Sequence, residues 1–108
     1  MGFDDYQQAA LRTATYGERN RVIYPALGLA SEAGEVAGKI KKVLRDQAGD
    51  FGRAPREALK DELGDVLWYL AVLAHDLGLS LDEIAARNID KLASRAERGT
   101  IGGSGDQR

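Results

Sequence analysis

The amino-acid sequence predicts an all-α protein, a bundle of four helices in which two long helices pack antiparallel. Three observations support this prediction. Apolar residues recur at helical spacing over long stretches, β-branched residues are few, and glycine and proline separate the periodic stretches. The length of 108 residues corresponds to a single domain with one modest core.

The first two predicted helices are bounded by glycine and proline. The first helix covers residues 4–16, because Gly17 provides a stop signal. The second covers residues 25–46, because Pro25 is favoured in the first turn of a helix. Residues 47–54 contain two glycines and are predicted to form the loop between the two long helices.

The third helix is predicted to begin at Pro55 and to end at Gly78, which suits a C-terminal cap. Ser80 and Glu83 have the spacing of a capping box and predict a fourth helix that ends at Gly99. Residues 1–98 are therefore predicted to be the helical domain. Residues 99–108 contain four glycines and form a tail whose composition favours a frayed terminus.

Each long helix carries an apolar stripe, and the two stripes are expected to face each other. The stripe on the second helix consists of Leu29, Ala33, Val36, Ile40 and Val43. The stripe on the third helix consists of Leu59, Leu63, Val66, Leu70, Leu73 and Leu77. Gly28, Gly34 and Gly38 each cost the second helix about 1 kcal/mol relative to alanine. Their presence predicts that a neighbouring helix or a ligand comes close there.

Composition excludes several classes of protein. Without cysteine the chain has no disulfide, no zinc–thiolate site and no thiol nucleophile. A net charge of −2 argues against a general electrostatic grip on nucleic acid. No apolar run approaches the ~20 residues of a membrane span, and residues 1–5 have no secretory signal pattern. We therefore expect a cytoplasmic protein with no nucleic-acid polymer and no membrane as partner.

Two pairs of acidic residues occupy equivalent positions on the two long helices. Glu32 and Glu35 are three residues apart on the second helix, and Glu62 and Asp65 are three residues apart on the third. Both pairs lie at the same angle from their apolar stripes, so they converge if the stripes face each other. Four clustered carboxylates repel one another, and a divalent cation relieves this repulsion. Oxygen ligands alone suit magnesium or manganese, although a solvated acidic face remains the alternative.

Basic residues provide candidate contacts for an anionic ligand. Asn88, Lys91 and Arg95 lie on one face of the fourth helix. Lys39 and Lys42 share a face with the glutamates of the second helix. The alternative for both groups is an ordinary solvated face, which for the second helix also satisfies the helix dipole.

Three further residues of the third helix are informative. Tyr69 lies near the acidic edge, where it either stacks on a ligand or packs in the core. Trp68 points away from the predicted stripe, which indicates either a subunit interface or partial burial by the first or fourth helix. His75 is the only histidine and is expected to be a surface or interface residue.

Several motifs together resemble the all-α nucleoside triphosphate pyrophosphatases, the MazG-like family. The run YPALGLASEAGEV at residues 24–36, continued by residues 41–46, is similar to the first motif of that family. Residues 62–69 resemble the second motif and residues 88–95 the third. The tail from residue 98 to residue 108 is similar to the ending of small phage-type and bacterial members. The resemblance covers roughly residues 6 to 108.

The resemblance implies magnesium-dependent hydrolysis of nucleoside triphosphates to the monophosphate and pyrophosphate, with manganese as a substitute ion. It implies metal binding by the four acidic residues and a water activated by Glu32 or Glu35. It also implies a dimer or tetramer with active sites near subunit interfaces, and a tail that closes over the nucleotide with Arg108 as a phosphate contact. The resemblance implies substrate contacts by Asn88, Lys91 and Arg95, and the further candidate substrate-binding residues are Lys39, Lys42, Tyr69 and Arg108.

Two alternatives stay open at this point. Phosphoribosyl-ATP pyrophosphatases share the same acidic motifs on helices, and the sequence does not distinguish their substrate. A helical partner-binding or regulatory module without catalysis is the second alternative, and it predicts that magnesium has no effect.

Overall fold

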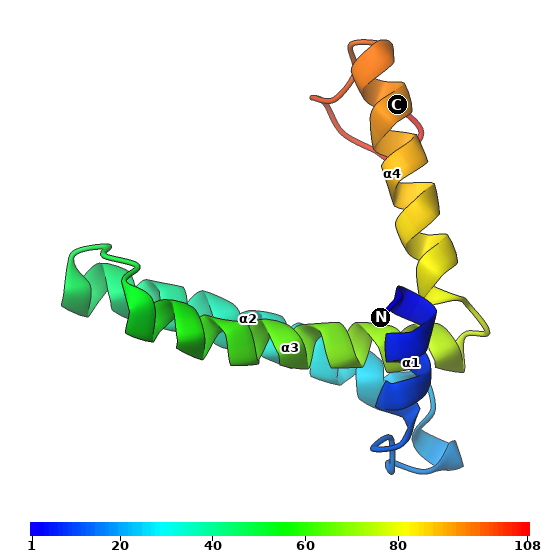
Figure 1. The fold of residues 1–108 in the computed structure, drawn as a ribbon. Coiled ribbons are helices and arrows are strands. Elements are labelled where there is room, and N and C mark those ends of the chain that lie inside the picture. Colours follow the sequence, from blue (N-terminus) through cyan, green and yellow to red (C-terminus); the bar gives the residue numbers. More distant parts are fainter.

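The computed structural model describes residues 1–108 and contains helices without any strand (Figure 1). In chain order the elements are α1 (Phe3–Leu11), a 3-10 turn η1 (Glu18–Asn20), α2 (Ile23–Gln47), α3 (Arg53–Asp76) and α4 (Leu81–Glu97). The prediction of an all-α fold with four helices is confirmed. None of the helices combines the length and the hydropathy that a transmembrane span requires.

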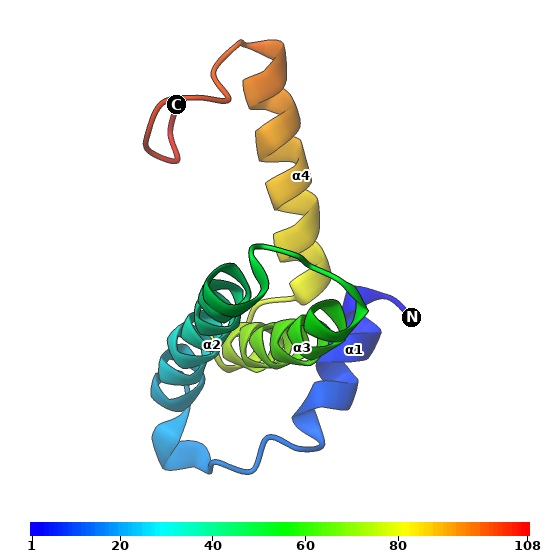
Figure 2. The same cartoon turned by 90° about the vertical axis from the view of Figure 1, so that its left-hand side faces the viewer.

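The long helices α2 and α3 lie antiparallel side by side, as predicted (Figures 1 and 2). Each begins two residues before the predicted position. The turn between them starts at Ala48 (φ +53°) and Gly49 (φ +77°), and the Gly49 N–H donates to the carbonyl of Val43 at 3.1 Å. This left-handed ending satisfies a carbonyl of the last turn of α2 and reverses the chain.

Helix α1 is shorter than predicted and ends at Leu11 instead of Tyr16. The Thr13 hydroxyl donates to the carbonyl of Ala10 at 3.1 Å, a local bond that competes with continued helix. Residues 12–22 form an irregular connection around η1, with Gly17 at φ +82°. The sequence did not predict this connection.

Helix α4 begins as predicted. The Gly78 backbone has φ +73°, and the Leu79 N–H donates to the carbonyl of Ala74 at 2.8 Å, which ends α3. The Ser80 hydroxyl accepts a bond from the Glu83 N–H at 3.2 Å and caps α4. The start of α4 packs against α1 and α3, and the helix then extends away from α2 and α3 (Figures 1 and 2).

The core lies where α1, α3 and the start of α4 meet. It consists of Ala10, Ala71, Val72 and Leu81, with Trp68 and other residues partly buried around it. The buried Gln7 holds the three elements together. Its Nε2 donates to the carbonyls of Ala71 at 3.0 Å and Leu79 at 3.1 Å, and its Oε1 accepts from the Leu81 N–H at 3.3 Å.

The predicted apolar stripes are only partly buried. Val43 is buried, but Leu63 remains 55% exposed and Leu77 53% exposed. The physical reason is that α1 packs on a different face of α3 from α2, so that Ala71 and Val72 become the most buried residues. Over most of its length the α2–α3 pair has no third layer in the single chain (Figure 1).

Candidate functional site

Three acidic side chains from the two long helices meet in one cluster. Glu32 on α2 and Glu62 and Asp65 on α3 each offer a carboxylate oxygen, and these oxygens all lie within 4.8 Å of one another. Glu32 and Glu62 are partly buried, and Asp65 is exposed. Glu35 is exposed one turn away on α2, and its carboxylate is not part of this group. The structure thus brings together three of the four predicted ligands.

The cluster is electrostatically unfavourable without a cation. Burial, followed by the charges of Asp65 and Glu62, raises the pKa of Glu32. The Lys39 ammonium lies 3.5 Å from Glu62 Oε1 and supplies one compensating charge. Three carboxylates at this spacing form an oxygen-only donor set that fits a hard divalent cation.

Aromatic side chains continue from the acidic cluster towards α1. Tyr69 on α3 lies against Gly28 on α2, where even a Cβ atom would overlap its ring. Burial, the neighbouring Tyr24 and the charges of Glu32 and Asp65 raise the pKa of Tyr69. The prediction that Tyr69 lies near the acidic edge is therefore confirmed. Of the three glycines, Gly28 alone has a close neighbour at its Cβ position.

A cavity of about 260 Å³ opens beside these aromatic rings. The Tyr16 and Tyr24 rings stack with centroids 5.1 Å apart, and Tyr24 lies 6.2 Å from Tyr69. The residues that line the cavity are Thr13, Thr15, Tyr16, Asn20, Tyr24, Trp68 and Tyr69. Sequence reasoning missed Tyr16, Tyr24 and Asn20. The one available signal was the concentration of tyrosine directly before the acidic motif of α2.

The sequence left the locations of the Trp68 and His75 side chains open. Trp68 is partly buried against the core, and its Nε1 donates to the Thr13 hydroxyl at 2.9 Å. Burial beside α1 is thus the outcome for Trp68. His75 is exposed, as predicted.

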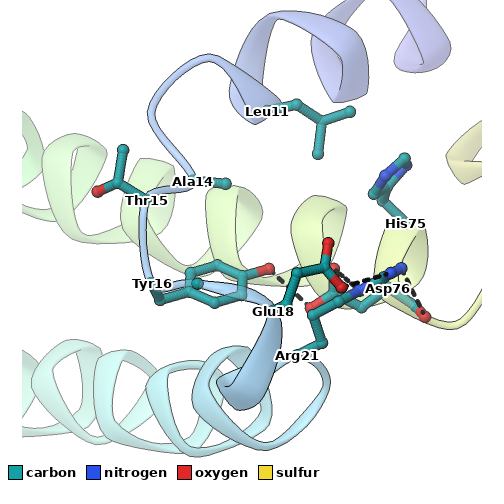
Figure 3. Close-up of a pocket in the computed structure, with 9 residues that line it drawn as sticks. Leu11, Ala14, Thr15, Tyr16, Glu18, Arg21, His75 and Asp76 are labelled. Atoms are coloured by element: carbon teal, nitrogen blue, oxygen red, sulfur yellow. Dashed lines mark hydrogen bonds and ion pairs between the residues drawn. The ribbon is translucent and has the colours of Figure 1, made fainter.

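The buried carboxylate of Asp76 fastens the α1–α2 connection to the end of α3 (Figure 3). Its Oδ2 accepts bonds from the Tyr16 hydroxyl at 2.7 Å and from the Val22 N–H at 2.9 Å, and Arg21 lies 3.6 Å from Oδ1. Burial raises the pKa of Asp76, but the bonds from Val22 and Tyr16 outweigh it and the pKa is lowered. Burial and the bond to Asp76 raise the pKa of Tyr16 to about 12. These contacts position the tyrosine stack and border a second cavity, of about 450 Å³.

Lys39 and Lys42 border a hollow of about 280 Å³ between α2 and α3, towards the loop. Pro55 and Leu59 of α3 form part of its opposite wall. Lys39 therefore connects this hollow to the acidic cluster, while Lys42 lies one turn further away.

The predicted contacts on α4 lie on a helix that extends away from the acidic cluster (Figure 1). Asn88 is exposed and Lys91 is partly buried, whereas Arg95 is 3% exposed. Lys91 and Arg95 both pair with Asp106 of the tail. In the single chain these cations and the carboxylate cluster thus form two separate groups.

Arg108 is bound within the tail. Its guanidinium donates to four carbonyl oxygens, those of Thr100, Ile101, Gly102 and Gly105. The tail therefore folds against α4, and in this chain neither it nor Arg108 reaches the acidic cluster (Figure 1).

Comparison with known proteins identifies the family of the chain. The family model described as the MazG nucleotide pyrophosphohydrolase domain matches residues 25–100, which include the acidic cluster and the cations of α4. The chain is 46% identical over 114 aligned positions to the gene 37 protein of Mycobacterium phage L5, with all of both chains covered. No solved structure matches the chain.

Proposed function

Because the chain belongs to the MazG nucleotide pyrophosphohydrolase family, we propose that it hydrolyses nucleoside triphosphates to the monophosphate and pyrophosphate with magnesium. The observation that carries this proposal is the convergence of Glu32, Glu62 and Asp65 within 4.8 Å. Manganese is the expected substitute, because it accepts the same oxygen ligands.

The acidic cluster would hold the metal ion. Glu32, Glu62 and Asp65 are the ligands that the geometry favours, and rotation of the exposed Glu35 side chain would add a fourth. When bound, the ion would neutralise charge on the triphosphate and polarise the anhydride bond. The neighbouring carboxylates contribute to the raised pKa of Glu32, and Lys39 compensates only one of their charges. A bound cation would relieve the repulsion that is left.

The other residues of the site act on water, phosphates and the nucleoside. Glu32 or Glu35 orients and deprotonates the attacking water, because no side chain near the cluster is an evident covalent nucleophile. Lys39 and Lys42 contact the phosphates from α2, and Tyr69 packs against the nucleoside. On α4, Asn88, Lys91 and Arg95 contact the substrate and stabilise the leaving pyrophosphate.

The separation of α4 from the acidic cluster supports a homo-oligomer. The chain exposes 7638 Å², about 1,700 Å² more than the roughly 5,900 Å² typical of a compact protein of this mass. Ile89 and Leu92 on α4 are 66% and 41% exposed, and Leu27 on α2 is 68% exposed. A second copy would cover these side chains and bring cations of α4 to the carboxylates of a neighbour. We propose a dimer or tetramer on this basis.

A substrate panel tests the proposed reaction. Pyrophosphate release is measured from canonical and modified nucleoside triphosphates and from phosphoribosyl-ATP, with and without magnesium. Glu32→Gln and Glu62→Gln are expected to reduce release at least ~100-fold while the protein stays folded. Glu57→Gln on the same helix as Glu62 is the matched control, because Glu57 pairs with Lys60 on the surface. Pyrophosphate release from phosphoribosyl-ATP alone would contradict nucleoside triphosphates as the substrate. Absence of release from every compound would contradict the proposed reaction.

Sedimentation equilibrium tests the oligomer. We expect a mass of two or four times 11.7 kDa for the wild-type chain. Ile89→Glu is expected to weaken association because it places a charge on the exposed apolar face of α4. A monomeric wild-type protein at micromolar concentration would contradict the proposal.

A further inference from the structure

The glycine-rich tail is an ordered structure built around Arg108. The four carbonyl bonds of its guanidinium are joined by a bond from Arg98 Nη2 to the backbone oxygen of Arg108 at 2.9 Å. Gly103 and Gly105 have φ values of +92° and +85°, which L side chains rarely adopt. The expectation of a frayed terminus, drawn from composition, does not describe this structure.

This fold places one carboxylate of the tail on the two cations of α4. Asp106 Oδ1 lies 3.2 Å from Lys91 Nζ and 3.2 Å from Arg95 Nη2, and the backbone oxygen of Asp106 accepts from Arg95 Nη2 at 2.9 Å. The Arg95 side chain is only 4% exposed, whereas that of Asp106 is 78% exposed. The tail therefore covers the arginine, and Asp106 itself faces solvent.

The arginine is incompletely satisfied in this arrangement. Its Nε is buried and has no hydrogen-bond partner. A guanidinium donates in a planar fork that matches two oxygens of a phosphate, and a buried donor without an acceptor is costly. Both acceptors that Asp106 offers, its carboxylate and its backbone oxygen, bond to Nη2 and leave Nε without a partner.

We propose that the tail is an intramolecular competitor of the substrate. Asp106 holds Lys91 and Arg95 in the free chain, and the phosphates of the nucleotide or of pyrophosphate displace it and release the tail. This inference rests on the proposed function for the identity of the displacing anion. Phosphates can bind the two cations only in chains whose tail is open. The apparent affinity for phosphates is therefore the intrinsic affinity multiplied by the fraction of chains with an open tail.

The absence of cysteine allows the tail to be observed directly. Ser104→Cys places one thiol on the exposed tail for a spin label, and Gln8→Cys on α1 provides a label far from it. Pyrophosphate is titrated in the presence of magnesium, and label mobility and calorimetric affinity are recorded. The same affinity is measured for Asp106→Asn and Asp106→Ala. Asp90→Asn is the matched control, because it removes an exposed charge from α4 that forms no ion pair or hydrogen bond with Lys91 or Arg95.

The label at position 104 is expected to become more mobile as pyrophosphate binds, while the label at position 8 does not change. Both Asp106 variants are expected to bind pyrophosphate roughly 3- to 10-fold more tightly than the wild type, as two partly exposed ion pairs allow. Asp90→Asn is expected to change affinity less than 2-fold.

Unchanged mobility at saturating pyrophosphate would overturn the proposal, as would weaker binding by the Asp106 variants. Absence of pyrophosphate binding would overturn it as well. Because these measurements require no turnover, tail release in a protein without hydrolytic activity would contradict the proposed reaction and still support the competitor.

Discussion

Gly28 allows the two long helices to come together beside the acidic cluster, and Gly28→Ala tests this contact. A Cβ atom at this position would lie closer than 3.0 Å to three ring carbons of Tyr69. The ring can withdraw only by giving up its contacts with Trp68 and Tyr24, whose ring centroids lie 5.0 Å and 6.2 Å away. The substitution therefore forces α2 and α3 apart or displaces a side chain next to Glu32.

The magnitude follows from two opposing effects. Alanine stabilises a helix by about 1 kcal/mol relative to glycine, while an extra methyl group in a filled space costs about 1–3 kcal/mol. Gly34→Ala and Gly38→Ala provide the reference, because no atom lies within 4 Å of a Cβ built there. These two variants are expected to gain about 1 kcal/mol, and Gly28→Ala is expected to be less stable than either by about 1–3 kcal/mol.

Urea denaturation at one protein concentration measures these differences, since association would otherwise change the apparent stability. A double-mutant cycle isolates the steric effect. In a Tyr69→Ala background the ring is absent, and Gly28→Ala is expected to become as favourable as Gly34→Ala. If Gly28→Ala alone stabilises the wild-type chain as much as Gly34→Ala, the close approach of Tyr69 is not a constraint and the reasoning is wrong.

Three further predictions concern the ends of α1 and α3. Gln7→Leu is expected to lower the free energy of unfolding by about 2–4 kcal/mol in urea, because it removes three hydrogen bonds to backbone groups, two of them buried. A loss below 1 kcal/mol would show that water bonds to these backbone groups in the variant. Asp76→Asn is expected to cost about 1–3 kcal/mol, because it weakens the bonds from Tyr16 and Val22; Tyr16→Phe, which removes one of the two, is expected to cost less. Hydrogen bonds from the start of α4 lower the pKa of Asp4 below its usual 3.8. The stabilisation is therefore present above that value and is lost as pH falls through the lower pKa of the folded state. Denaturation from pH 2 to 6 is expected to show a smaller pH dependence for Asp4→Asn, and equal slopes would contradict this.

Local signals predicted the helices, because helix boundaries depend on neighbouring residues. Ser80 caps the start of α4 and Gly78 follows the end of α3, as predicted, and each affects only the adjacent helical turn. The same holds for the acidic pairs, since three of the four carboxylates meet once the long helices lie antiparallel. The end of α1 was missed because the bond from the Thr13 hydroxyl competes with the helix, and nothing in the spacing reveals which of the two wins.

The remaining features depend on contacts between residues far apart in sequence. The Asp76 carboxylate is 60 residues from Tyr16, and no periodicity links them. Arg95 was predicted to contact substrate because it follows Lys91 along one helix face, but whether it faces solvent depends on how the tail folds. Burial of Ala71 and Val72 likewise depends on which face of α3 packs against α1. The apolar pattern of α3 alone does not predict that face.

The bonds of Gln7 also have a consequence for the order in which the chain completes its core during synthesis. Gln7 leaves the ribosome early, yet its partner Ala71 follows 64 residues later. At about 5–20 residues per second, α1 therefore waits roughly 3–13 s for the surface that buries it. The α2–α3 hairpin has its partners nearby in the chain and can form during that interval. The N-terminal helix is thus expected to join the fold only after the hairpin has formed and the start of α4 has been synthesised.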